Sequence, residues 1–216
     1  MKKIMWIVAV FPVVVASMVL QLIPDMVPHK IGNFIFPIVI LCITFFWHLL
    51  ICIFEKKAVK ASTEKERMEA NSSARVLCVV GLSQAIMFGI MNFCILYSSC
   101  VQKNGNGSKS TVDIARISCI LCGIVFIVVG NFMTKAKRNT VVGFRTAWSM
   151  YNDNTWRKSN RFGSISIVIA GVLTIITTVF ANGITSTILL LVYLLSATVI
   201  AILYSKRVYD QEKREV

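Results

Sequence analysis

Residues 184–204 read ITSTILLLVYLLSATVIAILY, a stretch of 21 residues without a charged side chain. A helix needs about 20 consecutive, mostly apolar residues to cross the hydrocarbon core of a bilayer. Similar apolar stretches precede this one, at residues 4–23, 33–54, 75–97, 114–134 and 162–181. The sequence therefore predicts an all-α, polytopic membrane protein with six transmembrane helices.

The overall composition supports this class of protein. Of the 216 residues, 56% are hydrophobic and 15% are charged, and the mean hydropathy is +0.72. A soluble domain of this length could not bury so much apolar surface in one core. The chain begins with a charged MKK like a signal peptide, but the apolar run that follows is longer than usual and no clean A-x-A site ends it. We therefore expect residues 4–23 to remain as the first span.

The distribution of positive charge predicts the orientation in the membrane. If the six spans alternate in direction, the N-terminus, the connections 55–74 and 135–161, and the tail from Ser205 lie on one side. With Arg75 included, this side holds 19 of the 23 Lys and Arg residues. Cytoplasmic loops carry such an excess, so both termini are predicted to be cytoplasmic. The net charge of +13 then indicates topology and attraction to anionic membrane lipids rather than direct binding of nucleic acid.

The cysteines and the known catalytic motifs give no sign of an enzyme. Cys119 and Cys122 form a C-x-x-C, but no second pair or neighbouring histidine completes a zinc site. The chain contains no H-E-x-x-H, no G-x-S-x-G and no glycine-rich phosphate loop. Cysteines inside membrane spans behave as small hydrophobic residues. We expect a protein without catalytic activity, cofactor or metal.

Small residues recur at helical spacing within three of the predicted spans. Such residues let two membrane helices approach closely, so they predict the contact seams of a helix bundle. The predicted seams are Gly81, Ala85 and Gly89 in the third span, Cys119, Gly123 and Gly130 in the fourth, and Ser164, Gly171 and Thr178 in the fifth.

Three polar residues lie inside predicted spans, where they are costly and suggest a function. Gln84 and Asn92 in the third span could bond to neighbouring helices or line a cavity, and packing is the favoured interpretation. His48 in the second span could relay protons, although a lone histidine more often bonds to a backbone carbonyl. Together His48, Gln84 and Asn92 form a possible intramembrane polar site.

The connection 135–161, called the elbow below, is rich in amides, arginines and tryptophans. Asn152, Asp153 and Asn154 are good helix N-cap residues, so a helix is predicted to begin at TWRKSNRF and to enter the membrane. Trp156, Asn160 and Gly163 would share a face of that helix. Residue types alone favour a cytoplasmic elbow that is anchored in the membrane interface by its tryptophans.

Arg145 is predicted to hold the elbow in shape. Its guanidinium suits carboxylates and the carbonyl end of a helix, so we expect it to bond near the end of the fourth span, with Trp148 packed beside it.

Eleven positions in and around the elbow also match a family pattern. They are Gly130, Asn131, Asn139, Gly143, Arg145, Thr146, Trp148, Trp156, Asn160, Arg161 and Phe162. Their spacing resembles the signature of the SdpI-like family of bacterial membrane immunity proteins, G-N-x-M followed by N-x-x-x-G-x-R-T-x-W and W-x-x-x-N-R-F. Met133 fits the same pattern, and the resemblance extends over about residues 114–204.

The first part of the chain resembles the family more loosely. Pro24, Pro28, His29 and Gly32 resemble a turn of an N-terminal domain that is associated with the family. In that domain a longer extracytoplasmic stretch follows the histidine, whereas this chain enters the second span almost directly. The resemblance divides the chain into an N-terminal two-span region, residues 1–74, and a four-span region, residues 75–216.

The resemblance implies a multi-pass protein of the bacterial cell membrane that protects the cell from a secreted toxin peptide. It also implies capture of a small DNA-binding autorepressor at the cytoplasmic face. A transporter or peptide exporter is the first alternative, which a polar cavity around the intramembrane site would favour. A membrane enzyme would need a clustered nucleophile and base.

Overall fold

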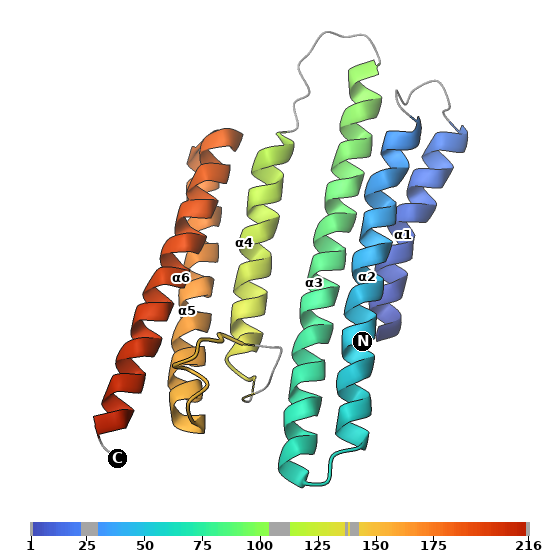
Figure 1. The fold of residues 1–216 in the computed structure, drawn as a ribbon. Coiled ribbons are helices and arrows are strands. Elements are labelled where there is room, and N and C mark those ends of the chain that lie inside the picture. Colours follow the sequence, from blue (N-terminus) through green and yellow to red (C-terminus); the bar gives the residue numbers. More distant parts are fainter. Residues whose placement is uncertain (1, 23–29, 104–112, 137, 139–142, 215–216) are drawn as a thin grey trace.

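The computed structural model describes residues 2–22, 30–103, 113–136, 138 and 143–214, which form six helices (Figure 1). The helices are α1 (Lys2–Leu22), α2 (Lys30–Val59), α3 (Glu64–Lys103), α4 (Ile114–Met133), α5 (Asp153–Phe180) and α6 (Gly183–Arg214). Among these residues, five stretches are long and apolar enough to cross a membrane: Phe36–Val59, Glu64–Ser98, Ile114–Met133, Asp153–Phe180 and Gly183–Arg214. The protein is therefore all-α and polytopic in the membrane, as the sequence predicts. The predicted first span, residues 4–23, is not among these five stretches and stays a prediction.

Several helices extend beyond the stretches that are predicted to lie in the membrane. The longest is α3, with 40 residues. At a rise of 1.5 Å per residue it is about 60 Å long, twice the thickness of a hydrocarbon core. Thr63 precedes its first residue, and the Thr63 hydroxyl accepts a hydrogen bond from the amide of Glu66 (3.3 Å). The predicted division between residues 74 and 75 falls inside this continuous helix.

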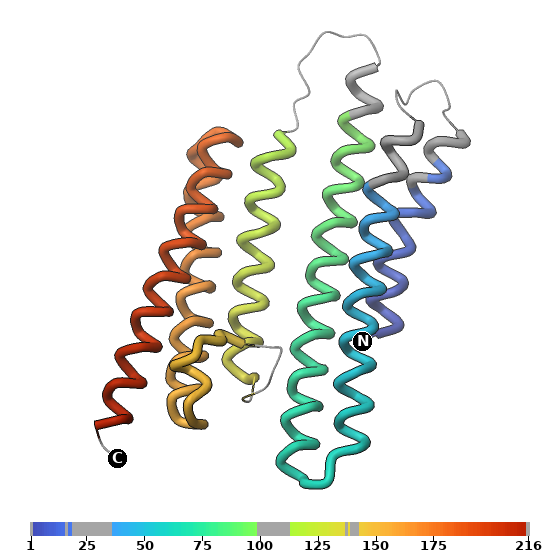
Figure 2. Tube along the Cα trace, in the orientation of Figure 1, coloured from blue at the N-terminus to red at the C-terminus, as the bar shows by residue number. Residues whose placement is uncertain are grey.

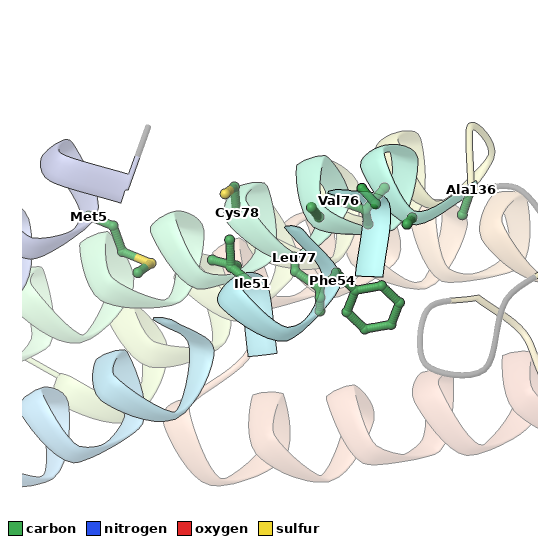
Figure 3. Packing of buried hydrophobic residues seen from close by; sticks show 10 residues of the cluster. Met5, Ile51, Phe54, Val76, Leu77, Cys78 and Ala136 are labelled. Atoms are coloured by element: carbon green, nitrogen blue, oxygen red, sulfur yellow. The ribbon is translucent and has the colours of Figure 1, made fainter. Parts of the chain in front are cut away.

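The helices form two groups of three, which are visible in Figure 1 and as a Cα trace in Figure 2. One group contains α1, α2 and α3, the other contains α4, α5 and α6, and the contact between α3 and α4 joins them. A buried apolar cluster of the first group includes Met5, Ile51, Phe54 and Leu77 (Figure 3). Ala136 of the elbow belongs to the same cluster. The elbow thus packs against the first group although it connects two helices of the second.

Glycines bring α4 and α5 into close contact. A Cβ atom at Gly123 would lie 2.8 Å from the carbonyl oxygen of Gly171, and one at Gly130 would lie 2.8 Å from that of Ser164. A larger residue at either position would push the two backbones apart. All six predicted seam residues of these helices are buried: Cys119, Gly123, Gly130, Ser164, Gly171 and Thr178. The two predicted seams are confirmed, and they face each other.

The predicted seam of α3 faces the other two helices of its group. A Cβ atom at Gly81 would lie 2.9 Å from the sulfur of Met5, and one at Gly89 would lie 3.3 Å from Cγ of Pro12. Ala85 is buried between these positions. The small residues therefore let α1 lie close to α3, as predicted.

Arg116 ties α4 to the C-terminal end of α5, at the end of the bundle opposite the elbow. Its guanidinium donates to the carbonyl oxygens of Thr178 (3.1 and 3.3 Å) and Val179 (2.7 Å). The last carbonyls of a helix lack backbone donors and carry the negative end of its dipole, so a cation is well placed there. Asp113 caps the start of α4 by accepting from the amide of Arg116 (3.1 Å).

Two sets of predicted residues fall at least partly outside the described residues. Pro24, Pro28 and His29 of the predicted turn are outside, whereas Gly32 lies in the first turn of α2. Asn139 of the family pattern is also outside.

Candidate functional site

The elbow is anchored to the end of α4 by two buried side chains of α5. The side-chain amide of Asn160 donates to the carbonyl oxygen of Met133 (2.7 Å), and the indole of Trp156 donates to that of Ala136 (3.2 Å). Trp156 and Asn160 are 3% and 2% exposed. The Met133 carbonyl also accepts from the amide of Ala136 (3.0 Å), so the Asn160 amide is a second donor to the last carbonyl of α4. The predicted face of Trp156, Asn160 and Gly163 is confirmed, because all three residues are buried.

Gly143 turns the chain over this pair of side chains. Its φ angle is +118°, in the region that favours glycine. A Cβ atom here would lie 2.5 Å from the ring of Trp156 and 2.8 Å from the side-chain oxygen of Asn160. The same oxygen accepts a hydrogen bond from the amide of Phe144 (2.9 Å). Glycine is therefore required both by the backbone conformation and by the space that the two α5 side chains occupy.

A hydroxyl network connects the elbow to α6. Thr146 and Ser149 exchange bonds between backbone amides and hydroxyls, at 2.8 Å and 3.0 Å. The Ser149 hydroxyl also donates to the carbonyl oxygen of Phe144 (3.0 Å). Thr146 Oγ1 lies 2.7 Å from Ser205 Oγ on α6, and Ser149 and Ser205 are fully buried. Thr146 of the family pattern thus joins the elbow to the last helix.

The start of α5 is capped as predicted, and it also forms hydrogen bonds with Glu212 near the C-terminal end of α6. Asn152 is the N-cap residue and forms a capping box with Thr155. The side-chain amides of Asn152 (3.2 Å) and Asn154 (2.7 and 3.0 Å) donate to the Glu212 carboxylate, which lies beyond the predicted span 184–204. The bonds from Asn154, supported by Asn152 and the charge of Lys158, hold the pKa of Glu212 below its ordinary value despite partial desolvation.

The arginines of the family pattern are exposed, which corrects the prediction for Arg145. Neither Arg145 nor Arg161 forms a hydrogen bond or ion pair with another described residue. The carbonyls at the end of α4 are engaged instead by α5 side chains, since these project from a helix packed directly against that end. Asn131 is also exposed.

Two aromatic residues of the pattern, Phe162 and Trp148, contact α6. Phe162 stacks on Tyr204, with ring centroids 4.0 Å apart and planes at 14°. The ammonium group of Lys206 lies 5.9 Å from the ring of Trp148. Trp148 is half-buried beside Lys206 of α6, whereas the side chain of Arg145, three residues earlier, is exposed.

Ion pairs connect the elbow to the first helix group. The Asp153 carboxylate pairs with Lys65 of α3 (3.0 Å) and with Arg138 of the elbow (2.9 Å). The Ser72 hydroxyl of α3 donates to the carbonyl oxygen of Lys135 (3.2 Å). Because the ion pairs are largely exposed, each contributes little stability, but together these contacts set the position of α3 beside the elbow.

The predicted intramembrane polar residues do not form one site. His48 of α2 accepts a hydrogen bond at Nδ1 from the indole of Trp6 (3.2 Å), and its Nε2 lies 3.5 Å from the sulfur of Cys52. An indole only donates, so a neutral His48 carries its proton on Nε2. The partner of His48 is therefore a tryptophan rather than the expected backbone carbonyl.

Gln84 and Asn92 bond across helices at two separate places. Gln84 Oε1 accepts from the indole of Trp47 (2.6 Å), and the Asn92 amide lies 3.5 Å from the carbonyl oxygen of Pro12. These contacts support the packing interpretation. An apolar cavity of about 400 Å³ lies between α1 and α3, and among the three polar residues only Asn92 lines it. Its lining is Ile7, Val8, Phe11, Pro12, Val15, Ile86, Gly89, Ile90, Asn92 and Phe93.

Several residues that organise the elbow were missed from the sequence. Ser149, Thr155 and Ser205 are buried hydroxyls, and Glu212 is a carboxylate in a charged tail. Polar residues of these types are common on surfaces, so nothing in the sequence distinguishes Ser149, Ser205 and Glu212. A detectable signal for Thr155 was its position three residues after Asn152, the spacing of a capping box.

These features define the class: an all-helical, polytopic membrane protein with an ordered polar elbow at one end of its bundle. A model of the SdpI/YfhL protein family matches residues 135–205, from the elbow into α6. The family resemblance predicted from the sequence is thereby confirmed for this region of the chain.

A known protein matches the chain over a similar extent. Immunity protein SdpI of Bacillus subtilis (strain 168) is 32% identical over 100 residues. The match covers 46% of this chain and 48% of that protein, so it spans about half the length of each. No solved structure matches the chain.

Proposed function

We propose that the protein is a membrane immunity protein that protects a bacterium from a secreted toxin peptide. It crosses the cell membrane six times, with both termini and the elbow in the cytoplasm. Protection comes from binding or occlusion of the peptide rather than from catalysis. The excess of Lys and Arg in the connections and tail on the elbow side supports this orientation.

The observation that carries the proposal is the position of the family match on the structure. It begins at the elbow and ends at Ser205, the α6 residue whose hydroxyl meets Thr146. The pattern residues Gly143, Trp156 and Asn160 build that elbow, and the last two are buried. A relative that shares about half its length with this chain is named an immunity protein.

A second part of the proposal is the capture of a small DNA-binding repressor at the elbow. The elbow contacts α3 as well as α4, α5 and α6, so a shift between the two helix groups would change its surface. A ligand that binds one arrangement better would favour that arrangement. The exposed Arg145 and Arg161 are available to a soluble partner.

Transport of a small molecule or peptide is the alternative function. The cavity between α1 and α3 is the observation that favours it. Its lining is almost wholly apolar, and His48 and Gln84 bond elsewhere, so the structure offers less support for a coupled transport site than for a packed immunity protein.

The test is expression of the full chain in a sensitive bacterium. Cells are challenged with a purified secreted antimicrobial peptide, and surviving cells are counted. We expect protection at normal membrane abundance, retained by His48→Ala and Cys119→Ala. Lack of protection by the wild-type protein would contradict the proposal, and loss of protection with either variant at unchanged abundance would favour proton coupling or chemistry. Energy-dependent movement of labelled peptide through inverted vesicles would favour transport.

A further inference from the structure

A cleft of about 560 Å³ lies where the tip of the α2–α3 hairpin meets the elbow. We call it the hairpin cleft. Except for Phe54, its lining lies beyond the predicted membrane spans. The lining residues are Phe54, Lys57, Lys60, Ala61, Glu66, Glu69, Ala70, Ser73, Arg138 and Met150.

The hairpin cleft combines an apolar part with charged walls. Phe54 and Ala70 are buried, at 5% and 4% exposed, and belong to the core of the first helix group. Met150 adds an apolar side chain from the elbow. An apolar centre with a polar rim is the usual anatomy of a protein-docking site.

The positive charges of the cleft come from two different elements. Lys57, in the last turn of α2, and Lys60, directly after its end, are exposed and form no ion pair with another described residue. Arg138 comes from the elbow, where its guanidinium pairs with Asp153 (2.9 Å) and donates to the carbonyl oxygen of Met150 (3.4 Å). The Arg138 side chain is therefore held in place, whereas the two lysines are free to meet an incoming carboxylate.

The negative charges lie on the α3 side of the cleft. Glu66 and Glu69 line it there, opposite in sign to Lys57 and Lys60. Nucleic acid or an anionic lipid head group would be repelled by these carboxylates. A protein segment can place a carboxylate toward α2 and backbone amides toward α3, so it can satisfy both walls.

We propose that the hairpin cleft docks a segment of a cytoplasmic protein that presents an apolar side chain with carboxylates on one side of it, toward Lys57 and Lys60. The cytoplasmic location of this partner rests on the orientation given under the proposed function. A volume of this size is within the usual range of about 300–1,000 Å³ for a binding pocket and accommodates a large apolar anchor. Because the cleft is lined by α2, α3 and the elbow, its occupant contacts the first helix group and the family-specific elbow together.

The first experiment measures binding by the full-length protein in phosphatidylcholine nanodiscs. The probe is a fluorescein-labelled heptapeptide with a Leu-Trp-Leu centre, two glutamates before it and two glutamines after it, and the comparison peptide carries lysines in place of the glutamates. Fluorescence anisotropy should show saturable binding of the acidic peptide, at least about tenfold tighter than the basic one. Absence of saturable binding, or equal binding of both peptides, would overturn the inference.

Charge reversal tests the lysine wall. Lys57→Glu combined with Lys60→Glu should weaken binding of the acidic peptide at least about tenfold. Lys56→Glu combined with Lys213→Glu changes the net charge equally at exposed positions outside the cleft lining, and it should have little effect. Equal loss from both pairs would mean that net charge, and not the cleft, binds the peptide.

Filling the cleft tests the apolar part without changing charge. Ala61→Trp places an indole in the lining and should abolish peptide binding, whereas Ser62→Trp, at the exposed neighbouring position, should retain it. Native mass spectrometry in nanodiscs with phosphatidylglycerol gives the competing outcome. Loss of bound lipid from Ala61→Trp with unchanged peptide binding would identify a lipid site and refute the inference.

The toxin-protection assay separates this inference from the proposed function. A wild-type protein that binds the acidic peptide but gives no protection would contradict the immunity proposal and leave the docking cleft standing. Protection of cells without saturable binding of the acidic peptide would contradict the docking cleft and leave the immunity proposal standing.

Discussion

At the scale of single residues, the elbow depends on Gly143. Its φ of +118° and the nearby ring of Trp156 both exclude a side chain. We predict that Gly143→Ala lowers the free energy of unfolding by about 3 kcal/mol through backbone strain and overpacking. Titration with SDS in mixed micelles measures this change. Gly89→Ala is the control, because its Cβ would meet only Cγ of Pro12 at 3.3 Å. An equal cost of both substitutions would contradict the special role of Gly143.

Asn160 and Arg145 both belong to the family pattern but have opposite structural roles. Asn160→Ala removes two hydrogen bonds and leaves the carbonyl of Met133 and the amide of Phe144 without these partners. We expect a loss of about 3 kcal/mol in the free energy of unfolding. Arg145→Ala should change it by less than about 0.5 kcal/mol because the side chain is exposed. The same SDS titration checks both values, and a large cost for Arg145→Ala would reveal a partner beyond the described residues.

Some residues of the family pattern build the elbow, whereas others are exposed and available to a partner. Buried members such as Trp156 and Asn160 build the elbow. Replacement of the exposed Arg145 or Arg161 should change the free energy of unfolding little. If the arginines contact a partner, their substitution should impair capture or immunity at normal protein abundance. Stability and function should therefore respond to different members of one motif.

At the scale of elements, α4 and α5 are joined by backbone contact. Gly123 and Gly171 let their helices meet with almost no side chain between them, and Ser164 continues the same contact opposite Gly130. Close packing of this kind stabilises membrane helices in the absence of a hydrophobic driving force between them. The elbow consequently connects two elements whose relative position is already fixed.

The contact between the elbow and α6 should depend on pH. The pKa of Glu212 is lowered in the folded state by the amide of Asn154, so its stabilising contribution is complete above the ordinary glutamate pKa of about 4.3 and is lost as pH falls below it. Spin labels at the exposed positions Arg145 and Gln211 should report a broader distance distribution at acidic pH than at neutral pH. Glu212→Gln should remove this pH dependence. A change centred near pH 7 would point to another titrating group.

At the scale of the whole molecule, the orientation in the membrane can be tested by cysteine labelling. In a protein without native cysteines, Asn106→Cys should react with an impermeant maleimide in intact cells. Ser62→Cys, exposed between α2 and α3, should react only after the membrane is permeabilised. The expected difference follows from the excess of Lys and Arg on the side of residue 62. Labelling of Ser62→Cys in intact cells would reverse the proposed topology.

Much of the molecule was predictable because its determinants are local. Apolar length predicts the helices, small residues at helical spacing predict the α4–α5 seam, and Asn152 was one of three predicted caps for α5. The family spacing predicts that the elbow matters, and the match over residues 135–205 agrees. The helices, the small-residue spacing and the cap are set by residues a few helical turns apart or by membrane thickness, and the family pattern is read along one continuous stretch of the chain.

The sequence by itself determined the membrane class, the helices and the polar elbow, since hydrophobic length and capping act over short distances. Only the tertiary structure decided which side chains hold the elbow. It brought Asn160 to Met133, Ser205 to Thr146 and Glu212 to Asn154, and it left Arg145 in solvent. The physical reason is that hydrogen bonds require atoms within about 3 Å in a suitable direction. Thr146 and Ser205, which are 59 positions apart, reach that distance through helix packing, which the sequence does not display.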